Sequence, residues 1–466
     1  MQPTITIFAF QSIFFLFSIS SFILFLLSSF LTTFSGSGFF ITFIVSAFFG
    51  FIIKFFKTRI LYGNAELIIS TLIIWCILIL LSSIPFYSLN DVSLSEVIFI
   101  GASLLTTTGF NVNELVNINN HNLLFLWQAL IQFIGACYSL ISYLLFFLLF
   151  FKSENISVNL SKQRIIKLLF YLTFVLFGYV FIIYIQDVSF YDSFLIASAI
   201  FSSGGFIGYY GHFLGAENTD SSLISLLTAL MILNIFLIPI FLYFGYNKIF
   251  NKYYKKMFSR IAMISAFFAL IVVYICSSTS LSISQNLFLC FSMLTTTGLL
   301  PVSITDVYLL KEFRPYLLIF VMFSTFGALS GSVSGGLKLD KISLIFIKMK
   351  EELTKILYAH NLKGIEIIKK GSNEEELNSF YSLLAFGCMV SIICILFHTL
   401  QGYTFETAFL YTLAALTNTG DGMLILGEID RSQNNYLYYV LSIMMIIGRF
   451  ETVGYLLLFK RLLIRA

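Results

Sequence analysis

"SLLTTTGF", residues 103–110, is a short run of hydroxyl residues and glycine between long apolar stretches. It returns almost unchanged as "SMLTTTGL" at 292–299, and related strings stand at 201–206 ("FSSGGF") and 416–420 ("LTNTG"). About a dozen mostly apolar residues precede each polar run, too few for a helix to cross a bilayer. We therefore expect four re-entrant half-helices, each followed by a non-helical loop.

The composition is that of a membrane protein. Of 466 residues, 59% are hydrophobic and 11% are charged, whereas soluble domains carry about 25% charged residues. Mean hydropathy is +0.94. The six cysteines lie in apolar segments without ligand spacing, which suits packing better than disulfides or metal. We expect an all-α integral membrane protein with about ten spans, near 5–31, 38–56, 66–88, 123–151, 165–186, 222–247, 260–279, 315–347 (interrupted), 377–400 and 436–459.

Basic residues are distributed unevenly among the loops between these spans. Alternate loops and the C-terminal tail hold 23 of the 27 lysines and arginines, and the remaining loops hold most of the acidic residues. Because Lys and Arg are enriched in cytoplasmic loops, we expect both termini to be cytoplasmic.

The four strings recur at a regular interval. Their glycines at 109, 204, 298 and 420 are about 95 residues apart, and a charged loop at 348–376 lengthens the last interval. A fixed period indicates repeated structural units, here span, half-helix, span. The expected divisions are an N-terminal two-span extension (1–60), repeat 1 (61–160), repeat 2 (161–255), repeat 3 (256–350), a cytoplasmic loop (351–376) and repeat 4 (377–466).

Four such loops around one axis would form an ion filter. Non-helical backbone at membrane depth must be buried in protein or line a water-filled cavity, and rings of backbone carbonyls replace the hydration shell of a cation. The half-helices would also aim their partly negative C-terminal ends at the centre. Threonine and glycine could merely end one helix, but four matched loops favour a filter. The candidate cation ligands are Thr107, Thr108, Gly109, Ser202, Ser203, Gly204, Thr296, Thr297, Gly298, Asn418, Thr419 and Gly420.

This pattern resembles the TrkH/KtrB superfamily of potassium transporters over essentially the whole chain. "GALSGSVSGGLKLDK" (327–341) is similar to the family's intramembrane gating loop. "IIGRFETVGYLLLF" (446–459) is similar to its Gly-Arg-x-Glu signature, with Arg449 and Glu451 in the matching positions. The two extra N-terminal spans favour the TrkH branch. The serines of the second string and Asp421 after the fourth glycine depart from the family pattern.

The resemblance implies the potassium-translocating subunit of a bacterial-type uptake system in the inner (plasma) membrane. It also implies a homodimer regulated by a cytoplasmic nucleotide-binding subunit of the TrkA type. A sodium or mixed sodium/potassium transporter of the same architecture is the alternative. Whether transport is channel-like or coupled, as in a symporter, stays open.

Two further elements are candidates for gating. Small residues dominate 327–336, with Gly327, Gly331, Gly335 and Gly336, which suits a flexible constriction better than a simple kink. Arg449 lies in an apolar span, where a charge is costly. It either pairs structurally, with Glu451 or with pore-helix carbonyls, or acts as a fixed positive charge beneath the filter.

Other functional classes lack support in the sequence. No nucleotide-binding, HExxH, CxxC or GxSxG motif occurs, and the four histidines are scattered. We therefore expect no enzyme, no cofactor in this chain and no nucleic-acid partner. A passive scaffold would not need four matched loops. The charged loop at 348–376 is either a solvated helix or a docking site for a regulator.

Overall fold

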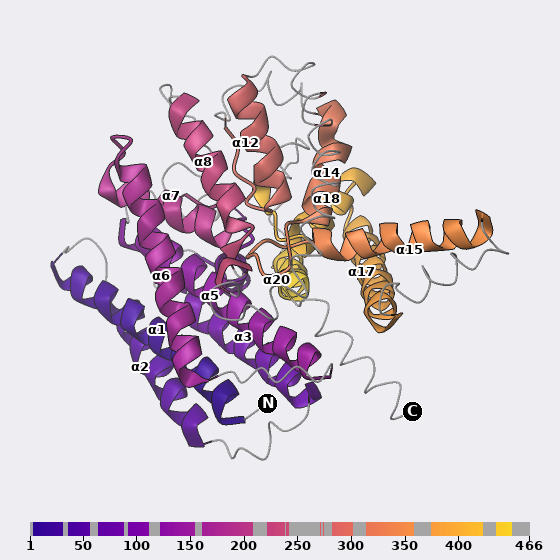
Figure 1. Ribbon diagram of the computed structural model, residues 1–466. Helices are drawn as coiled ribbons and strands as arrows, with labels where there is room; N and C mark the ends of the chain where they lie inside the picture. The colour runs from indigo at the N-terminus through magenta and orange to yellow at the C-terminus, as the bar shows by residue number, and fades with distance from the viewer. Residues whose placement is uncertain are drawn as a thin grey trace.

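The computed structural model is built from helices, as the apolar sequence predicts (Figure 1). No β-strand occurs among the described residues. The all-α prediction is confirmed. The structure describes residues 3–30, 36–55, 64–87, 92–110, 122–153, 161–207, 221–237, 239–241, 271, 274, 282–301, 314–357, 374–422 and 435–449.

Four helices are long and apolar enough to cross a membrane by length and composition, within the part of the chain that the structure describes. Their apolar windows cover Ile5–Phe30, Ile69–Tyr87, Asn122–Leu145 and Lys162–Tyr184. The predicted span near 260–279 lies outside the described residues, apart from positions 271 and 274. The count of ten spans therefore stays a prediction.

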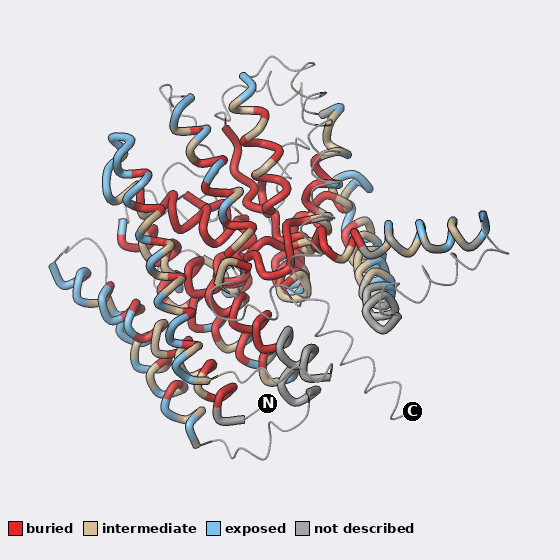
Figure 2. The backbone as a smooth tube through the Cα atoms, viewed as in Figure 1, coloured by how far each residue is buried: buried red, intermediate tan, exposed pale blue. Residues whose placement is uncertain are grey.

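Exposed aromatic side chains mark a surface suited to lipid. Helix α6 (Lys162–Tyr184) exposes a stripe of phenylalanines at 170, 174, 177 and 181, with Phe174 78% exposed. Buried residues instead fill the middle of the molecule (Figure 2). An apolar exterior of this kind would be unfavourable in water. The chain is a multi-pass membrane protein.

The N-terminal helices pack tightly beside the centre of the molecule. Helices α1 (Pro3–Phe30) and α2 (Ser37–Ile52) form a pair on one flank (Figure 1). Phe17 and Phe39 contact the ring of Trp127 edge-on from these helices. Trp127 lies in α5 (Asn122–Ser153) and donates to the Ser82 carbonyl of α3 (Asn64–Tyr87). This packing fixes α3 and α5 around the first short helix.

Four short helices lie between the longer ones: α4 (Leu94–Leu105), α7 (Phe190–Ser202), α12 (Ile283–Leu294) and α18 (Phe405–Leu416). Three of the four pack against a longer helix that follows another short helix. Helix α5 contacts α7, α8 (Ser221–Asn234) contacts α12, and α20 (Asn435–Arg449) contacts α4. The last described helix thus packs against the first short helix, which closes the arrangement on itself.

The predicted interruption of the eighth span lies between two described helices. Helix α14 (Leu317–Phe326) ends at Gly327, and α15 (Leu339–Leu357) then leaves the bundle sideways (Figure 1). Residues 348–357, which we placed in the charged loop, continue this helix. They are helical because the apolar and charged residues along α15 have the spacing of an amphipathic helix. The next described helix is α17 (Glu374–Leu400), which packs against α18.

Candidate functional site

The four short helices begin with the same kind of cap. Each N-cap is a hydroxyl residue whose side chain accepts a hydrogen bond from the backbone N–H three residues later, which satisfies a free helix donor. In α4 and α12 a Glu or Gln at that third position completes a capping box. The N-caps are Ser93, Ser189, Ser282 and Thr404.

Each short helix also ends in the same backbone geometry. One non-glycine residue after the helix has a left-handed φ between 50° and 55°. Its N–H donates to the carbonyl three residues before, and the next N–H donates to the carbonyl five residues before. A glycine with φ between 62° and 80° follows two positions later. The left-handed residues are Thr107, Ser203, Thr296 and Asn418, and the glycines are Gly109, Gly205, Gly298 and Gly420.

This geometry corrects the register of the second string. We matched Gly204 with the other filter glycines, and Ser202 and Ser203 with the pairs before them, but Gly205 occupies the matching place. Ser202 is the last residue of α7, one position before the left-handed residue. The sequence carries a signal for this register. Each ring glycine follows the N-cap of its short helix by the same number of residues. In the second string two adjacent glycines, Gly204 and Gly205, made this spacing harder to recognise.

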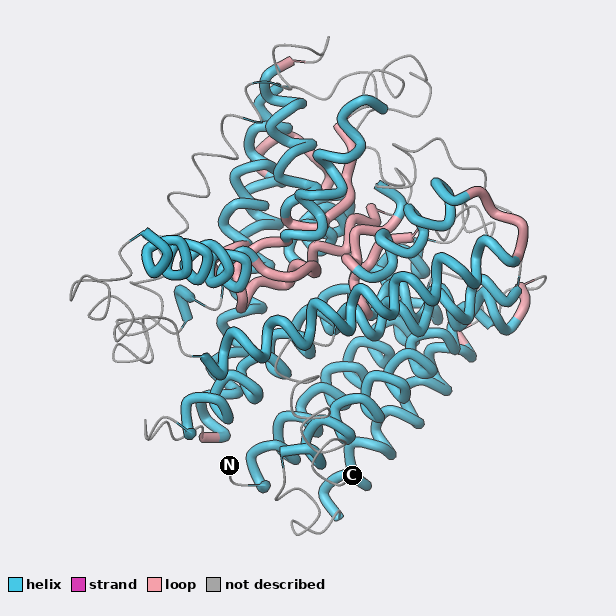
Figure 3. The backbone as a smooth tube through the Cα atoms, turned by 90° about the vertical axis from the view of Figure 1, so that its right-hand side faces the viewer, coloured by secondary structure: helices cyan, strands magenta, loops and turns pink. Residues whose placement is uncertain are grey.

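The four loops follow one another in order around a closed ring. A Cβ added to Gly109 would collide with the carbonyl oxygen of Gly204, from the second loop. In the same way Gly205 lies against the Thr297 carbonyl, Gly298 against that of Thr419, and Gly420 against that of Thr108. Each glycine therefore lets the next loop approach with its carbonyl. The sequence candidates Thr108, Gly204, Thr297 and Thr419 supply these carbonyls, and the loops meet in the middle of the helices (Figure 3).

Paired hydroxyls brace three of the loops. The hydroxyl oxygens of Thr106 and Thr108 lie 2.7 Å apart, and that of Thr106 donates to the Ala102 carbonyl. Matching pairs at 295/297 and 417/419 lie 2.8 and 2.7 Å apart. These hydroxyls bond to each other and to their own helix, so they hold the loop backbone in place.

Close helix packing supports the loops from outside, a feature that the sequence reasoning missed. A Cβ at Gly135 of α5 would collide with the Leu105 carbonyl, and one at Gly448 of α20 with the Leu416 carbonyl. At the corresponding place in α8, Asn234 donates to the carbonyls of Ile200 and Phe201 at 2.5 and 2.8 Å. The signal in the sequence was one small or amide residue at the same depth in each of these three helices.

The segment 327–336 folds under the third and fourth loops. The Gly335 N–H donates to Thr296 Oγ1 at 2.8 Å, and a Cβ at Gly335 would collide with the Thr417 carbonyl. The glycines at 327, 331 and 336 have positive φ. Of the glycines predicted to act in gating, Gly335 therefore contacts the third and fourth loops directly.

Two charged side chains just beyond this segment hold it in shape. Lys338 is 4% exposed, and its ammonium donates to the carbonyls of Ser332, at 3.3 Å, and Ser334. Asp340 Oδ1 accepts from the Ser330 N–H at 2.9 Å. We counted Lys338 among the cytoplasmic basic residues, but it is buried because the segment supplies carbonyls for its charge.

Arg449 joins the first loop to the segment 327–336. Its guanidinium donates to the Thr106 carbonyl, to the carbonyl of Thr107 at 3.0 Å and to its hydroxyl, and to the Val333 carbonyl. The sequence left open whether Arg449 pairs with Glu451 or with carbonyls at the end of a short helix, and the contacts are of the second kind. Glu451 lies outside the described residues. These oxygen acceptors compensate the positive charge of Arg449, which is only 8% exposed.

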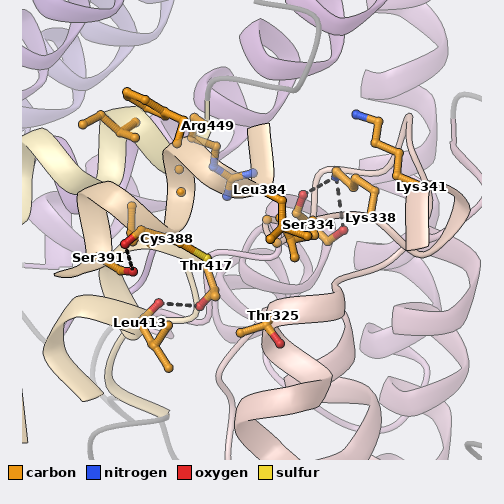
Figure 4. A pocket seen from close by; sticks show the side chains of 18 of the residues that line it. Thr325, Ser334, Lys338, Lys341, Leu384, Cys388, Ser391, Leu413, Thr417 and Arg449 are labelled. Atoms are coloured by element: carbon orange, nitrogen blue, oxygen red, sulfur yellow. Dashed lines mark hydrogen bonds between the residues drawn. The ribbon is translucent and has the colours of Figure 1, made fainter. Parts of the chain in front are cut away.

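A cavity of about 300 Å³ opens beside the gating segment. In Figure 4 the side chains of Arg449 and Lys338 both reach toward the segment around Ser334, and Thr417 and Cys388 line another part of the wall. Backbone carbonyls arranged in a ring are suitable ligands for a dehydrated cation.

Comparisons with known proteins find similarity to cation transport proteins. The family TrkH, described as cation transport protein, matches residues 261–464. "Trk system potassium uptake protein TrkH" of Escherichia coli K12 is 30% identical over 183 residues, which are 39% of this chain and 37% of that protein. The TrkG protein of the same strain is 26% identical over 38% of this chain and 36% of its own length. These matches thus span little more than a third of the curated relatives.

Longer matches cover nearly the whole chain. An uncharacterized cation transporter of Methanocaldococcus jannaschii is 24% identical over 433 residues, 89% of this chain and 86% of that protein. The crystal structure of the potassium transporter TrkH from Vibrio parahaemolyticus has the same fold. Its TM-score is 0.79 at 20% identity, with 98% of both chains covered.

The chain is thus similar to TrkH cation transport proteins over residues 261–464, and it has the fold of a TrkH potassium transporter over nearly its whole length.

Proposed function

We propose that this chain is the potassium-translocating subunit of a Trk-type uptake system, with the four loops as its ion filter. The observation that carries the proposal is the closed ring in which each loop's glycine lies against the next loop's carbonyl. Backbone carbonyls are suitable ligands for a dehydrated cation. The four short helices also end at this ring, so their partly negative C-termini favour a cation there.

The ligands in this proposal are the backbone carbonyls of the three residues ending at each ring glycine. For loops one, three and four these are the residues expected from the sequence. For the second loop they become Ser203, Gly204 and Gly205. The repeats divide the chain at the boundaries given above, and the N-terminal pair of spans precedes the first repeat.

The gating segment controls passage below the filter. Contacts to Thr296, Thr417 and, through Arg449, the first loop support this role. Moving the segment aside would connect the filter with the cavity beside it.

The remaining features of the proposal come from the family and from charge. The protein lies in the inner (plasma) membrane with both termini in the cytoplasm, forms a homodimer, and binds a cytoplasmic nucleotide-binding subunit of the TrkA type. That subunit acts on the segment 327–336 through α15, the helix that follows it.

Growth complementation tests the proposal. The full chain is expressed in a potassium-uptake-deficient bacterium on low potassium, with and without a co-expressed TrkA-type subunit. We expect growth, stronger with the subunit, and uptake of rubidium in preference to sodium. Uptake of sodium equal to or above that of rubidium would favour the sodium or mixed alternative. No uptake of either cation by abundant protein in the membrane would contradict the proposal.

A further inference from the structure

The side chain of Asn418 joins the fourth filter loop to the first. Its amide nitrogen, Nδ2, donates to Thr108 Oγ1 at 2.9 Å and to the Met445 carbonyl of α20 at 3.1 Å. All three residues are completely buried. A backbone carbonyl can only accept a hydrogen bond, so the contact with Met445 fixes which end of the amide faces these two oxygens. Asn418 is therefore a donor to the first loop.

This donor orients a row of hydroxyls in the first loop. Thr106 Oγ1 donates to the Ala102 carbonyl of α4 at 2.6 Å, and the hydroxyl oxygens of Thr106 and Thr108 lie 2.7 Å apart. Because a hydroxyl has one hydrogen to donate, the hydroxyl of Thr108 donates to that of Thr106. The row thus runs in one direction from Asn418 to the first short helix. Hydrogen bonds in such a row strengthen one another.

The cross-link is a feature of one junction of the ring. Three residues of the other loops match Asn418 in their left-handed backbone, and these are Thr107, Ser203 and Thr296. The hydroxyl of Thr107 accepts from the Arg449 guanidinium, and that of Thr296 accepts from the Gly335 N–H. In the described part of the chain, none of these three side chains bonds to another filter loop. Asparagine at this position therefore serves the junction between the fourth and first loops.

We propose that Asn418 is a positioning residue for cation preference, because its side chain holds the first and fourth loops together where the ring closes. The Thr108 carbonyl lies against Gly420, two residues after Asn418. A movement of Thr108 relative to the fourth loop therefore displaces a ring carbonyl, and rings of carbonyls select among dehydrated cations. The inference rests on the proposed filter function, in which Asn418 contributes its backbone carbonyl, and adds a separate role for its side chain.

The variant Asn418→Thr tests the proposal, because it gives the fourth loop the string "LTTTG" of the first and third loops. Threonine already occupies the left-handed position in those loops, where it makes no bond to another loop among the described residues. The measurement is paired rubidium and sodium uptake by the full chain in the complementing cells, at equal abundance in the membrane. We expect the rubidium-over-sodium ratio to fall roughly fivefold, the effect of losing about one hydrogen bond.

Two valine backgrounds separate loss of this bond from strain at position 418. Thr108→Val removes the acceptor of the Asn418 amide, whereas Thr297→Val breaks the matching hydroxyl pair of the third loop. Each change lies at a ring carbonyl, so each should lower the ratio by itself. Adding Asn418→Thr should lower the ratio roughly fivefold further beside Thr297→Val and by less than about twofold beside Thr108→Val. Strain or lost packing would lower it equally in both backgrounds.

An unchanged ratio in Asn418→Thr would overturn the inference, and so would equal further losses in the two valine backgrounds. Should Asn418→Thr fail to accumulate, Asn418→Ser replaces it, because serine holds the matching left-handed position at 203 and lacks the amide. The same losses are expected of it, and an unchanged ratio there also contradicts the inference. Wild-type cells without rubidium preference would instead refute the proposed filter function itself.

Discussion

Strained backbone is concentrated in the filter loops. Thr107, Ser203, Thr296 and Asn418 adopt left-handed conformations, which cost an L-residue roughly 1–2 kcal/mol each. Such strain persists only where surrounding contacts enforce it, and it clusters at functional sites. The hydroxyl pairs and the packed inner helices are contacts of this kind. The strain therefore supports the assignment of these loops to the site.

The sequence predicted most of the residues that the four loops bring together, and their role as ion ligands stays a prediction. Three of the four filter strings hold their predicted places, because threonine and glycine together mark a loop that needs tight backbone geometry. The second string was misplaced by one residue, because Ser202, Ser203, Gly204 and Gly205 fit either register. Only the spacing from the helix cap resolves it. The partners of Arg449 were left open in the sequence, since they lie more than 100 residues away in the chain.

Replacement of Arg449 should increase ion leak. In Arg449→Ala, the carbonyls of Thr106, Thr107 and Val333 lose charged donors, each worth about 1.5–3 kcal/mol, and the positive charge near the path disappears. We expect basal rubidium uptake without the nucleotide-binding subunit to rise several-fold. Arg449→Lys keeps the charge, but its single ammonium cannot bond both the first loop and the gating segment. Its basal rubidium uptake should therefore lie between that of wild type and that of Arg449→Ala. Normal uptake and ion preference in both variants, at normal abundance, would make Arg449 a purely structural residue.

At the scale of elements, the proposed pathway is formed by the capped short helices and the segment 327–336. The half-length of these helices was predicted from the sequence, because it depends on local residues, whereas their hydroxyl caps were not predicted. The fold of 327–336 was not. Sequence reasoning treated it as flexible because of its glycines, whereas Lys338 and Asp340 fix it through bonds to Ser330, Ser332 and Ser334. From sequence alone, charged residues next to a membrane segment are predicted to be solvated, because their partners are not known.

The link between the gating segment and the third loop can be tested by Thr296→Val. This change removes the acceptor of the Gly335 N–H and leaves the side-chain shape nearly unchanged. Loss of one hydrogen bond of about 1 kcal/mol should shift the gate roughly fivefold toward the open state. Rubidium efflux from loaded cells lacking the nucleotide-binding subunit measures this leak.

Thr325→Val is the matched control. Thr325 also lines the cavity, but its hydroxyl bonds to Met322 within the same helix. It should leave efflux unchanged. Equal efflux from Thr296→Val and wild type would remove this hydrogen bond from the gating mechanism.

For the whole molecule, the uneven distribution of basic residues predicts the orientation in the membrane. In a cysteine-free background, Gln186→Cys lies in the exposed turn after α6 and Lys350→Cys on the exposed face of α15. A membrane-impermeant thiol reagent added to intact cells should label position 186 and not 350. Labelling of position 350 from outside would contradict the predicted orientation and indicate the opposite one.

The central claim is that four loops form one filter, and a glycine series tests it most directly. Gly109→Ala, Gly205→Ala, Gly298→Ala and Gly420→Ala each place a Cβ against the carbonyl of the next loop and add left-handed strain of roughly 1–2 kcal/mol. The measurement is the ratio of rubidium to sodium uptake for each variant beside wild type, at equal abundance in the membrane. The account predicts that all four variants lower the ratio by a similar factor, on the order of tenfold. A ratio that falls in one variant and is unchanged in the other three would show that the loops do not act as a single ring.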